Sequence, residues 1–234
     1  MSCIVCDSHK ITKHDKVIAC QQCGHVYRDF GKINEKNYYT NEYRQKIVKN
    51  NEIIRPKEKL KQRALNIYKI INDYIKNDFT FLEVGFGEGH FAEVYAEQNG
   101  DKNYYCCEMS ELHSQEAKKR GLQVFNCGFQ DIDTEIRFDA IASFDVLEHI
   151  RNPYEYIEKL ETLLSVNGVA IIQVPTDRRL HSETPFDGHY HYFSKQSLNK
   201  LMGNKFRNLL FYKSQRGECA NGPEFLTVWK KEKE

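Results

Sequence analysis

Short apolar runs and amphipathic stretches alternate along most of this chain, from about residue 57 to residue 230. The apolar runs predict strands near residues 79–84, 103–107, 122–126, 138–144, 169–174, 207–214 and 224–230. The amphipathic stretches predict helices near residues 57–76, 89–99, 110–120, 152–164 and 194–203. Such alternation predicts an α/β fold with a doubly wound, mostly parallel seven-stranded sheet. The last two strands are expected to form an antiparallel pair at one edge.

The first predicted helix carries a clear amphipathic pattern. Apolar side chains recur at Leu60, Ala64, Ile67, Ile71 and Tyr74, and lysines occupy the other face. A period of three to four residues predicts a helix that packs on the sheet and joins it to the segment in front.

Three glycines at alternate positions follow the first predicted strand, at Gly85, Gly87 and Gly89. A strand that ends in a glycine turn and opens into a helix lets backbone N–H groups approach a ligand that a Cβ would block. The second predicted strand ends at Glu108, where a carboxylate can accept hydrogen bonds from ribose hydroxyls. The two strand ends together predict half of a nucleotide-type cofactor site.

The spacing of these glycines indicates which cofactor is bound. A dinucleotide fingerprint places its third glycine one residue later, where this chain has His90. Glu83 and Glu88 also place negative charge where a pyrophosphate would lie. A cofactor with an amino acid end and no phosphate fits better, although a glycine turn in another kind of α/β domain is the alternative.

The acidic-x-Gly-x-Gly-x-Gly string at residues 83–89 resembles motif I of the class I S-adenosylmethionine (SAM) dependent methyltransferases, whose fold is Rossmann-like. The segment at residues 143–150 resembles the motif on the strand that faces the transferable methyl group. The resemblance implies SAM as cofactor, S-adenosylhomocysteine as product, Glu108 on the ribose and Phe129 against the adenine. It implies these cofactor-binding residues: Glu83, Gly85, Phe86, Gly87, Gly89, Glu108, Met109, Gly128, Phe129, Gln130, Phe144 and Asp145.

A metal-ligand pattern stands at the front of the chain, where Cys3-x-x-Cys6 and Cys20-x-x-Cys23 are separated by 13 residues. Two such pairs can supply four thiolates in tetrahedral array to a structural Zn²⁺ ion. A redox dithiol and an iron–sulfur site are the competing interpretations. About 25 residues cannot bury a core of their own, so the metal is expected to stabilise this module. The neighbouring His9, His14 and His25 are interpreted as facing solvent.

The front segment resembles the zinc-binding front of bacterial methyltransferases that modify sugars and surface-polysaccharide precursors. That resemblance makes Tyr38, Tyr39, Tyr43 and Arg44 candidates for substrate contacts, and packing against the catalytic domain is the alternative. We expect three parts: a zinc-ribbon module at 1–30, a linker or substrate-side segment at 31–56, and the methyltransferase domain at 57–234.

Histidines near the expected methyl group are the candidates for catalysis. A hydroxyl acceptor needs a general base, and histidine titrates near neutral pH. We predict His149 and His191, then His189, as catalytic residues, while a structural role for each remains open. Arg178 and Arg179 lie in a long connection and are expected either to hold an acceptor phosphate or to be solvated.

Charge and composition narrow the partners. The net charge is +1, which gives the whole chain no electrostatic reason to bind nucleic acid, although its first third is basic. No apolar run is long enough to cross a membrane, and the first residues are unlike a signal peptide. The eight cysteines are not interpreted as disulfides, because four of them form the metal pattern. We therefore expect a soluble cytoplasmic protein.

The leading hypothesis is a SAM-dependent methyltransferase that acts on a small molecule, which can contain a sugar or a phosphate group. Its expected acceptor is a hydroxyl of a carbohydrate or of a capsule or surface-polysaccharide precursor. Two alternatives stay open: an RNA methyltransferase whose basic zinc module holds phosphates, and a non-catalytic SAM-binding scaffold.

Overall fold

The structure is a computed structural model that describes residues 1–14, 17–29, 56–176, 189–215, 218 and 224–232. It contains a seven-stranded sheet and a four-stranded sheet. The strands of the large sheet are β4 (Phe81–Val84), β5 (Tyr104–Cys107), β6 (Gln123–Phe125), β7 (Phe138–Phe144), β8 (Leu164–Pro175), β10 (Phe206–Lys213) and β11 (Glu224–Lys231). The helices are α2 (Lys57–Ile71), α3 (His90–Asn99), α4 (Glu111–Lys119), α5 (Pro153–Leu163) and α6 (Lys195–Met202).

The large sheet has the strand order β10-β11-β8-β7-β4-β5-β6. Strands β6, β5, β4, β7 and β8 run parallel, while β11 is antiparallel to both of its neighbours. The order reverses between β4 and β7, which is where an open α/β sheet binds its ligand, beyond the carboxyl ends of the strands. This arrangement confirms the predicted fold, including the antiparallel edge pair.

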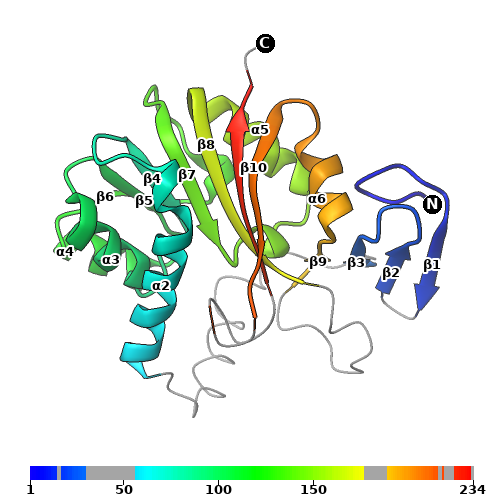
Figure 1. Ribbon diagram of the computed structural model, residues 1–234, viewed down its shortest axis with the longest axis horizontal. Helices are drawn as coiled ribbons and strands as arrows, with labels where there is room; N and C mark the ends of the chain where they lie inside the picture. Colours follow the sequence, from blue (N-terminus) through cyan, green and yellow to red (C-terminus); the bar gives the residue numbers. More distant parts are fainter. Residues whose placement is uncertain (15–16, 30–55, 177–188, 216–217, 219–223, 233–234) are drawn as a thin grey trace.

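The two faces of the sheet bury separate apolar layers. Neighbouring residues of one strand point to opposite faces, so Phe81 belongs to one layer and Leu82 to the other. The first layer packs under α2, α3 and α4, and the second packs under α5 and α6 (Figure 1). Every residue of β4 is buried, as expected for a central parallel strand.

Two predicted boundaries differ from the structure by five residues, while the others agree within two residues. Strand β8 begins at Leu164, five residues before the predicted strand at 169–174. The polar residues Ser165 and Asn167 hide this start in the sequence, and Asn167 has a φ of 65° within an irregular stretch of the strand. The predicted helix at 57–76 ends at Ile71 and continues as a 3-10 turn, η3 (Asn72–Tyr74).

The four-stranded sheet joins the front of the chain to its second half. Strands β1 (Ile11–His14), β2 (Val17–Cys20) and β3 (Val26–Arg28) form an antiparallel meander, and β3 also pairs with β9 (His191–Tyr192). The module therefore lies beside α6, at one end of the large sheet (Figure 1). The described part of the chain has no helix that is both long and apolar enough to cross a bilayer.

Candidate cofactor and acceptor site

The glycine loop after β4 adopts backbone conformations that favour glycine. Gly85, Gly87 and Gly89 have φ angles of 80°, 54° and 74°, all in the left-handed region. A Cβ on Gly85 would lie 2.7 Å from Val146 Cγ2, and one on Gly89 would lie 2.2 Å from the Phe86 ring. A Cβ on Gly87 would meet no described atom within 4 Å. The loop is thus packed at two glycines and open at the third.

Glu108 ties the second strand end to this loop. The Gly87 N–H donates to Glu108 Oε2 at 3.0 Å, and the Ser110 N–H donates to Oε1 at 2.7 Å. The carboxylate therefore lies under the open glycine, at the carboxyl end of β5, as the sequence predicted. Met109 is 63% exposed beside it.

Glu83 is a buried carboxyl behind the glycine loop. The Tyr104 hydroxyl donates to Glu83 Oε2 at 2.6 Å, and the side chain is among the pocket-lining residues. Burial raises the pKa of Glu83 to about 8, a hydrogen bond from Tyr104 opposes this, and the nearby Glu108 carboxylate adds to it. Burial therefore stabilises the protonated form of Glu83 relative to a carboxyl group in water.

A pocket lies between the glycine loop, β7 and α2. The loop contributes Gly85, Phe86 and Gly89, and the end of β7 contributes Phe144 and Asp145. Asp145 has a φ of 57° and is half-buried. The pocket is lined by these residues together with Leu60, Arg63, Ala64, Ile67, Glu83, Glu88, His90 and Phe91. It therefore brings six of the predicted cofactor residues to one place.

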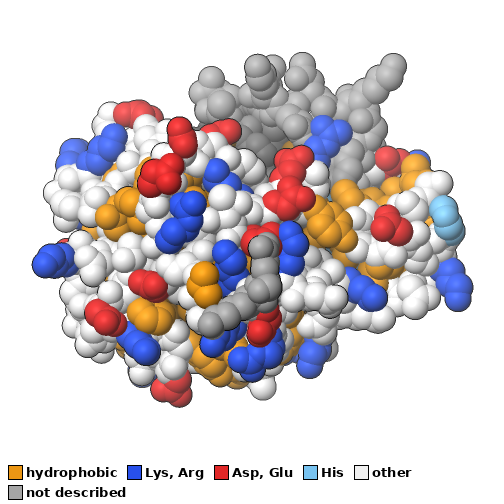
Figure 2. Space-filling model, turned by 90° about the horizontal axis from the view of Figure 1, so that it is seen from above, with side chains coloured by type: hydrophobic (Ala, Val, Ile, Leu, Met, Phe, Trp, Pro, Cys, Tyr) orange, Lys and Arg blue, Asp and Glu red, His pale blue; other side chains and the backbone are white. Residues whose placement is uncertain are grey.

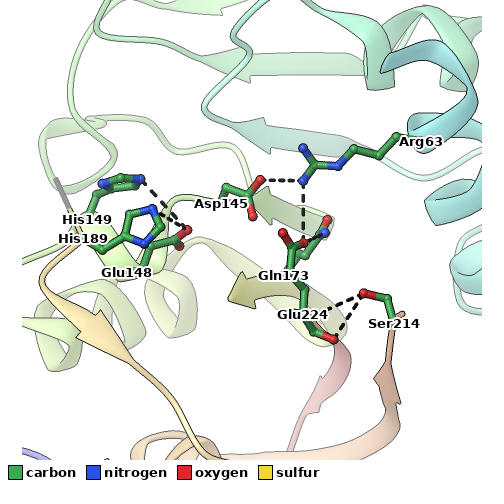
Figure 3. Close-up of polar contacts among 8 residues, drawn as sticks. All are labelled: Arg63, Asp145, Glu148, His149, Gln173, His189, Ser214 and Glu224. Atoms are coloured by element: carbon green, nitrogen blue, oxygen red, sulfur yellow. Dashed lines mark hydrogen bonds and ion pairs between the residues drawn. The ribbon is translucent and has the colours of Figure 1, made fainter. Parts of the chain in front are cut away.

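Arg63 closes this pocket and was missed by the sequence analysis. Its guanidinium donates to Asp145 Oδ2 at 2.5 Å and lies 3.7 Å from Glu224 Oε2, so it links α2 to β7 and β11 (Figure 3). Glu224 also accepts a hydrogen bond from Gln173. Arg63 falls on the same helical stripe as Leu60, Ala64 and Ile67, and a charge on an apolar stripe was the available signal.

The predicted adenine-binding residues follow β6. Gly128 and Gln130 are half-buried, while Phe129 is 3% exposed and its ring packs on Tyr156 with centroids 4.7 Å apart. Phe129 begins the 3-10 helix η4 (Phe129–Asp131). This ring therefore faces α5 in the structure, and its contact with adenine stays a prediction.

Glu148, His149 and His189 meet beyond the end of β7. Glu148 and His149 belong to the 3-10 helix η5 (Leu147–His149), and His189 comes from the segment before β9. The Nε2 atoms of His149 and His189 lie 4.0 and 3.9 Å from Glu148 Oε1, and both rings point toward that carboxyl (Figure 3). Burial, reinforced by Asp145, holds the pKa of Glu148 well above its ordinary value.

His191 lies apart from this group, inside the contact between the two sheets. It is fully buried, and its ring nitrogens lie 3.1 Å from His25 Nε2 and 3.1 Å from the Arg151 carbonyl oxygen. Burial lowers the pKa of His191 to about 4, so the imidazole is neutral. This environment favours the structural role that the sequence analysis left open for it.

The four front cysteines converge as the metal pattern requires. Cys3 Sγ lies 3.7 Å from Cys23 Sγ, and Cys6 Sγ lies 3.6 Å from Cys20 Sγ. Tetrahedral zinc with Zn–S bonds of about 2.3 Å separates its sulfurs by roughly 3.8 Å. Backbone N–H groups of Val5 and Cys23 point at sulfurs of the cluster. The donor set therefore fits zinc.

One expectation about this module is wrong. His25 does not face solvent, because β9 covers β3 and the ring packs between Tyr27 and Phe193. His9 and His14 are exposed, as expected. The candidates Tyr38, Tyr39, Tyr43, Arg44, Arg178 and Arg179 lie outside the described residues.

The comparisons with known proteins agree with this geometry. The sequence profile of a family described as “Methyltransferase domain” matches residues 41–205. No curated protein matches the sequence. The fold is similar to Burkholderia thailandensis 1,6-didemethyltoxoflavin-N1-methyltransferase, solved with 1,6-didemethyltoxoflavin and S-adenosylhomocysteine. That pair has a TM-score of 0.65 and 14% identity, over 96% of this chain and 100% of the other.

Two further solved structures share the fold. An N-methyltransferase from Bradyrhizobium japonicum WM9, in complex with S-adenosylhomocysteine, has a TM-score of 0.58 and 12% identity, over 86% of this chain and 94% of the other. Magnesium protoporphyrin IX methyltransferase from Synechocystis PCC 6803, with the same bound product, has a TM-score of 0.59 and 13% identity, over 73% and 83%. At such identities the likeness establishes the fold and leaves the acceptor open.

Proposed function

This chain belongs to the family of methyltransferase domains, and from that premise we propose that it moves a methyl group from SAM to a small-molecule acceptor at the carboxyl edge of the large sheet. The observation that carries the proposal is the open glycine at Gly87, whose N–H is bonded to Glu108. SAM supplies a methyl group that its sulfonium has already activated. The protein's task is to bind it and to align the acceptor.

The pocket residues fit the two ends of this cofactor. Glu83 and the glycine loop, with Phe144 and Asp145, receive the methionine part, and Glu108 accepts from the ribose hydroxyls. A buried carboxyl such as Glu83 gains an ionic partner when an ammonium group enters. Met109, Gly128, Phe129 and Gln130 form the adenine side.

Calorimetry with S-adenosylhomocysteine tests this assignment. We expect Gly87→Val to lower affinity at least tenfold, because its side chain would occupy the open space over the loop. Glu108→Ala should have a similar effect. The control is Glu111→Ala, since Glu111 is exposed and its carboxylate accepts a hydrogen bond from Gln115 on the same helix. Wild-type protein that does not bind the product would refute the proposal.

The acceptor is a hydroxyl of a carbohydrate or of a capsule or surface-polysaccharide precursor. The support is the resemblance of the front segment, together with the polar group formed by His149, His189 and Glu148 beside the predicted methyl position. We assign His149 and His189 to the acceptor and its proton. Mass spectrometry of activated sugars incubated with SAM and enzyme would detect a product 14 mass units heavier.

The front module holds a structural Zn²⁺ through Cys3, Cys6, Cys20 and Cys23. The spacing of the sulfurs supports this proposal. Elemental analysis should find zinc in the wild-type protein and no zinc in the Cys20→Ser variant. A folded front module without metal would contradict it.

We prefer a small-molecule acceptor to RNA. The net charge of +1 gives the whole chain little electrostatic attraction for phosphates. Acidic and basic side chains are also interspersed over the described residues on the face shown in Figure 2, which lies opposite the carboxyl edge of the large sheet. RNA binding that weakens with salt and vanishes on deletion of residues 1–50 would reverse this preference.

A further inference from the structure

The group formed by Glu148, His149 and His189 has the donor types of a metal site. One carboxylate oxygen and two imidazole nitrogens lie within 4.8 Å of one another. The two rings meet edge to face with centroids 4.7 Å apart, so their nitrogens approach the carboxyl from different directions. Figure 3 shows both rings directed at one oxygen of Glu148.

Glu148 provides the second, independent observation. Its side chain is fully buried, and neither carboxyl oxygen has a hydrogen-bond partner among the described residues. Leaving such a group without a partner costs several kcal/mol, and a negative charge there costs more. Asp145 and Glu224 add negative potential nearby, which Arg63 offsets in part. The site is therefore short of positive charge at its centre.

We propose that Glu148, His149 and His189 hold a divalent transition-metal cation at the acceptor side of the site. Donors around one ion at about 2.1 Å lie roughly 3 to 3.5 Å apart. The observed spans of 4.0 and 3.9 Å reach that spacing when each side chain moves by less than about an ångström. One carboxylate with two imidazoles suits zinc, manganese or iron(II), and leaves coordination positions open.

This cation site deepens the proposed function and rests on it. Two adjacent open positions would bind a pair of neighbouring oxygens, so the acceptor would carry vicinal hydroxyls or a hydroxyl beside a carbonyl. The cation favours loss of the hydroxyl proton to water. The oxygen's electron pair then forms the bond to the methyl carbon, while the carbon–sulfur bond breaks and its pair stays on sulfur. The two histidines would then act on the acceptor's proton through the cation that they bind, and neither would be a free general base.

The position of the group supports this role. Val146, two residues before Glu148, contacts the glycine loop so closely that Gly85 has no room for a Cβ. The cluster therefore lies directly beyond the loop that is proposed to hold SAM. The Tyr190 N–H donates to the Glu148 carbonyl at 2.7 Å, which fixes the His189 segment against η5.

Mn²⁺ titration followed by electron paramagnetic resonance tests the proposal on the full-length, zinc-loaded protein. Manganese prefers oxygen and nitrogen donors and leaves the four cysteines to zinc. We expect one bound Mn²⁺ per chain, with affinity lowered at least tenfold by Glu148→Gln and by His189→Ala. The control His113→Ala removes a histidine from α4, which is remote from the cluster, and should leave binding unchanged.

Further measurements distinguish misfolding from a failure of the cation site and from a failure of the proposed function. Thermal melts identify any variant that fails to fold, and His149→Asn provides a third ligand change at a half-buried position. Absence of Mn²⁺ binding, or binding that all three ligand substitutions leave unchanged, overturns the cation site. Calorimetry on the same samples measures the affinity for S-adenosylhomocysteine. If wild-type protein does not bind S-adenosylhomocysteine, the proposed function is wrong. If it binds S-adenosylhomocysteine but does not bind Mn²⁺, only the cation site is wrong.

Discussion

The two sheets of this protein are held together by different means. The large sheet buries an apolar layer on each face, with aromatic contacts such as Phe81 against Tyr104 at 5.2 Å. The small sheet has three short strands of its own and a fourth, β9, from the second half of the chain. Several of its buried residues belong to the same apolar cluster as the layer under α5 and α6, namely Cys3, Val5, Ile18, Cys20, Cys23 and Tyr27. The large sheet is stabilised by apolar burial on both faces, whereas the small sheet depends on a borrowed strand and, in our proposal, on a bound metal.

The small sheet contacts the proposed acceptor side of the site, whereas the glycine loop follows β4 of the large sheet, so the stability of the small sheet and cofactor binding can be tested separately. The borrowed strand β9 follows His189 closely, so the small sheet supports one wall of the proposed acceptor site. The Tyr154 hydroxyl donates to the Val5 carbonyl at 2.6 Å, and the Ser194 hydroxyl donates to the Cys23 carbonyl at 2.5 Å. Damage to the module is therefore expected to reach the acceptor before it reaches the cofactor.

The largest expected effect follows from removing the metal. The double substitution Cys20→Ser and Cys23→Ser should abolish zinc binding, which typically contributes roughly 10 to 16 kcal/mol to such modules. Hydrogen exchange should lose protection in β1, β2, β3 and β9, while the strands of the large sheet keep theirs. Cys127→Ser, outside the cluster, is the control. Protection of Val26–Arg28 in the zinc-free variant would show that the small sheet does not need metal.

The second largest effect concerns the buried carboxyl of Glu83 in the large sheet. The pKa of Glu83 is about 8 in the folded protein, whereas in the unfolded chain it lies near the ordinary value of 4.5. The unfolded state thus binds fewer protons between these values, and the free energy of unfolding falls as pH rises from about 4.5 to 8. Glu83→Gln should remove on the order of 4 kcal/mol of this fall. Urea denaturation across this range measures it, and identical pH profiles for both proteins would contradict the assignment.

A smaller effect compares two glycines of the same loop. Gly89→Ala meets both a positive φ and the Phe86 ring, whereas Gly87→Ala meets the positive φ alone. We expect Gly87→Ala to cost about 1 to 2 kcal/mol and Gly89→Ala to cost more. Chemical denaturation gives the two values, and calorimetry gives the affinity for S-adenosylhomocysteine. Equal losses of stability would mean that the loop relaxes freely around Phe86.

The smallest effect measures the contact between the sheets. His25→Phe or His191→Phe alone should leave the other imidazole with an unsatisfied nitrogen, while the double substitution removes both. A double-mutant cycle should give a coupling of about 0.5 to 1.5 kcal/mol. The rate of zinc release from the wild-type protein and from these variants is a second measurement of the same contact. Additive effects would show that the two rings merely pack beside each other.

Most of the large sheet could be predicted from the sequence because its pattern is local. Each strand is an apolar run and each helix an apolar stripe, so all seven strands were located. The start of β8 was missed where Ser165 and Asn167 interrupt the apolar run. The antiparallel edge was also predicted, since the sequence pattern indicates no helix between the last two strands.

Long-range contacts were harder to predict. The pairing of β3 with β9 joins distant segments, and nothing in a local period marks a two-residue strand. This pairing buries His25, so the wrong prediction that His25 faces solvent has the same cause. Arg63 was missed for a related reason, because its partners Asp145 and Glu224 come from β7 and β11. Six of the candidate cofactor residues line one pocket because they lie at the carboxyl ends of β4 and β7, which are neighbours in the sheet.

The borrowed strand also sets an order of events during synthesis. His25 and His191 lie 166 residues apart, so the ribosome needs roughly ten to thirty seconds to supply the second after the first. Throughout that interval the edge of β3 lacks its β9 partner, and the proposed zinc site would hold a half-covered sheet. Exposed edges of this kind recruit other chains. The small sheet is therefore completed late although most of it is made early, and in our proposal it depends on Zn²⁺ in the meantime.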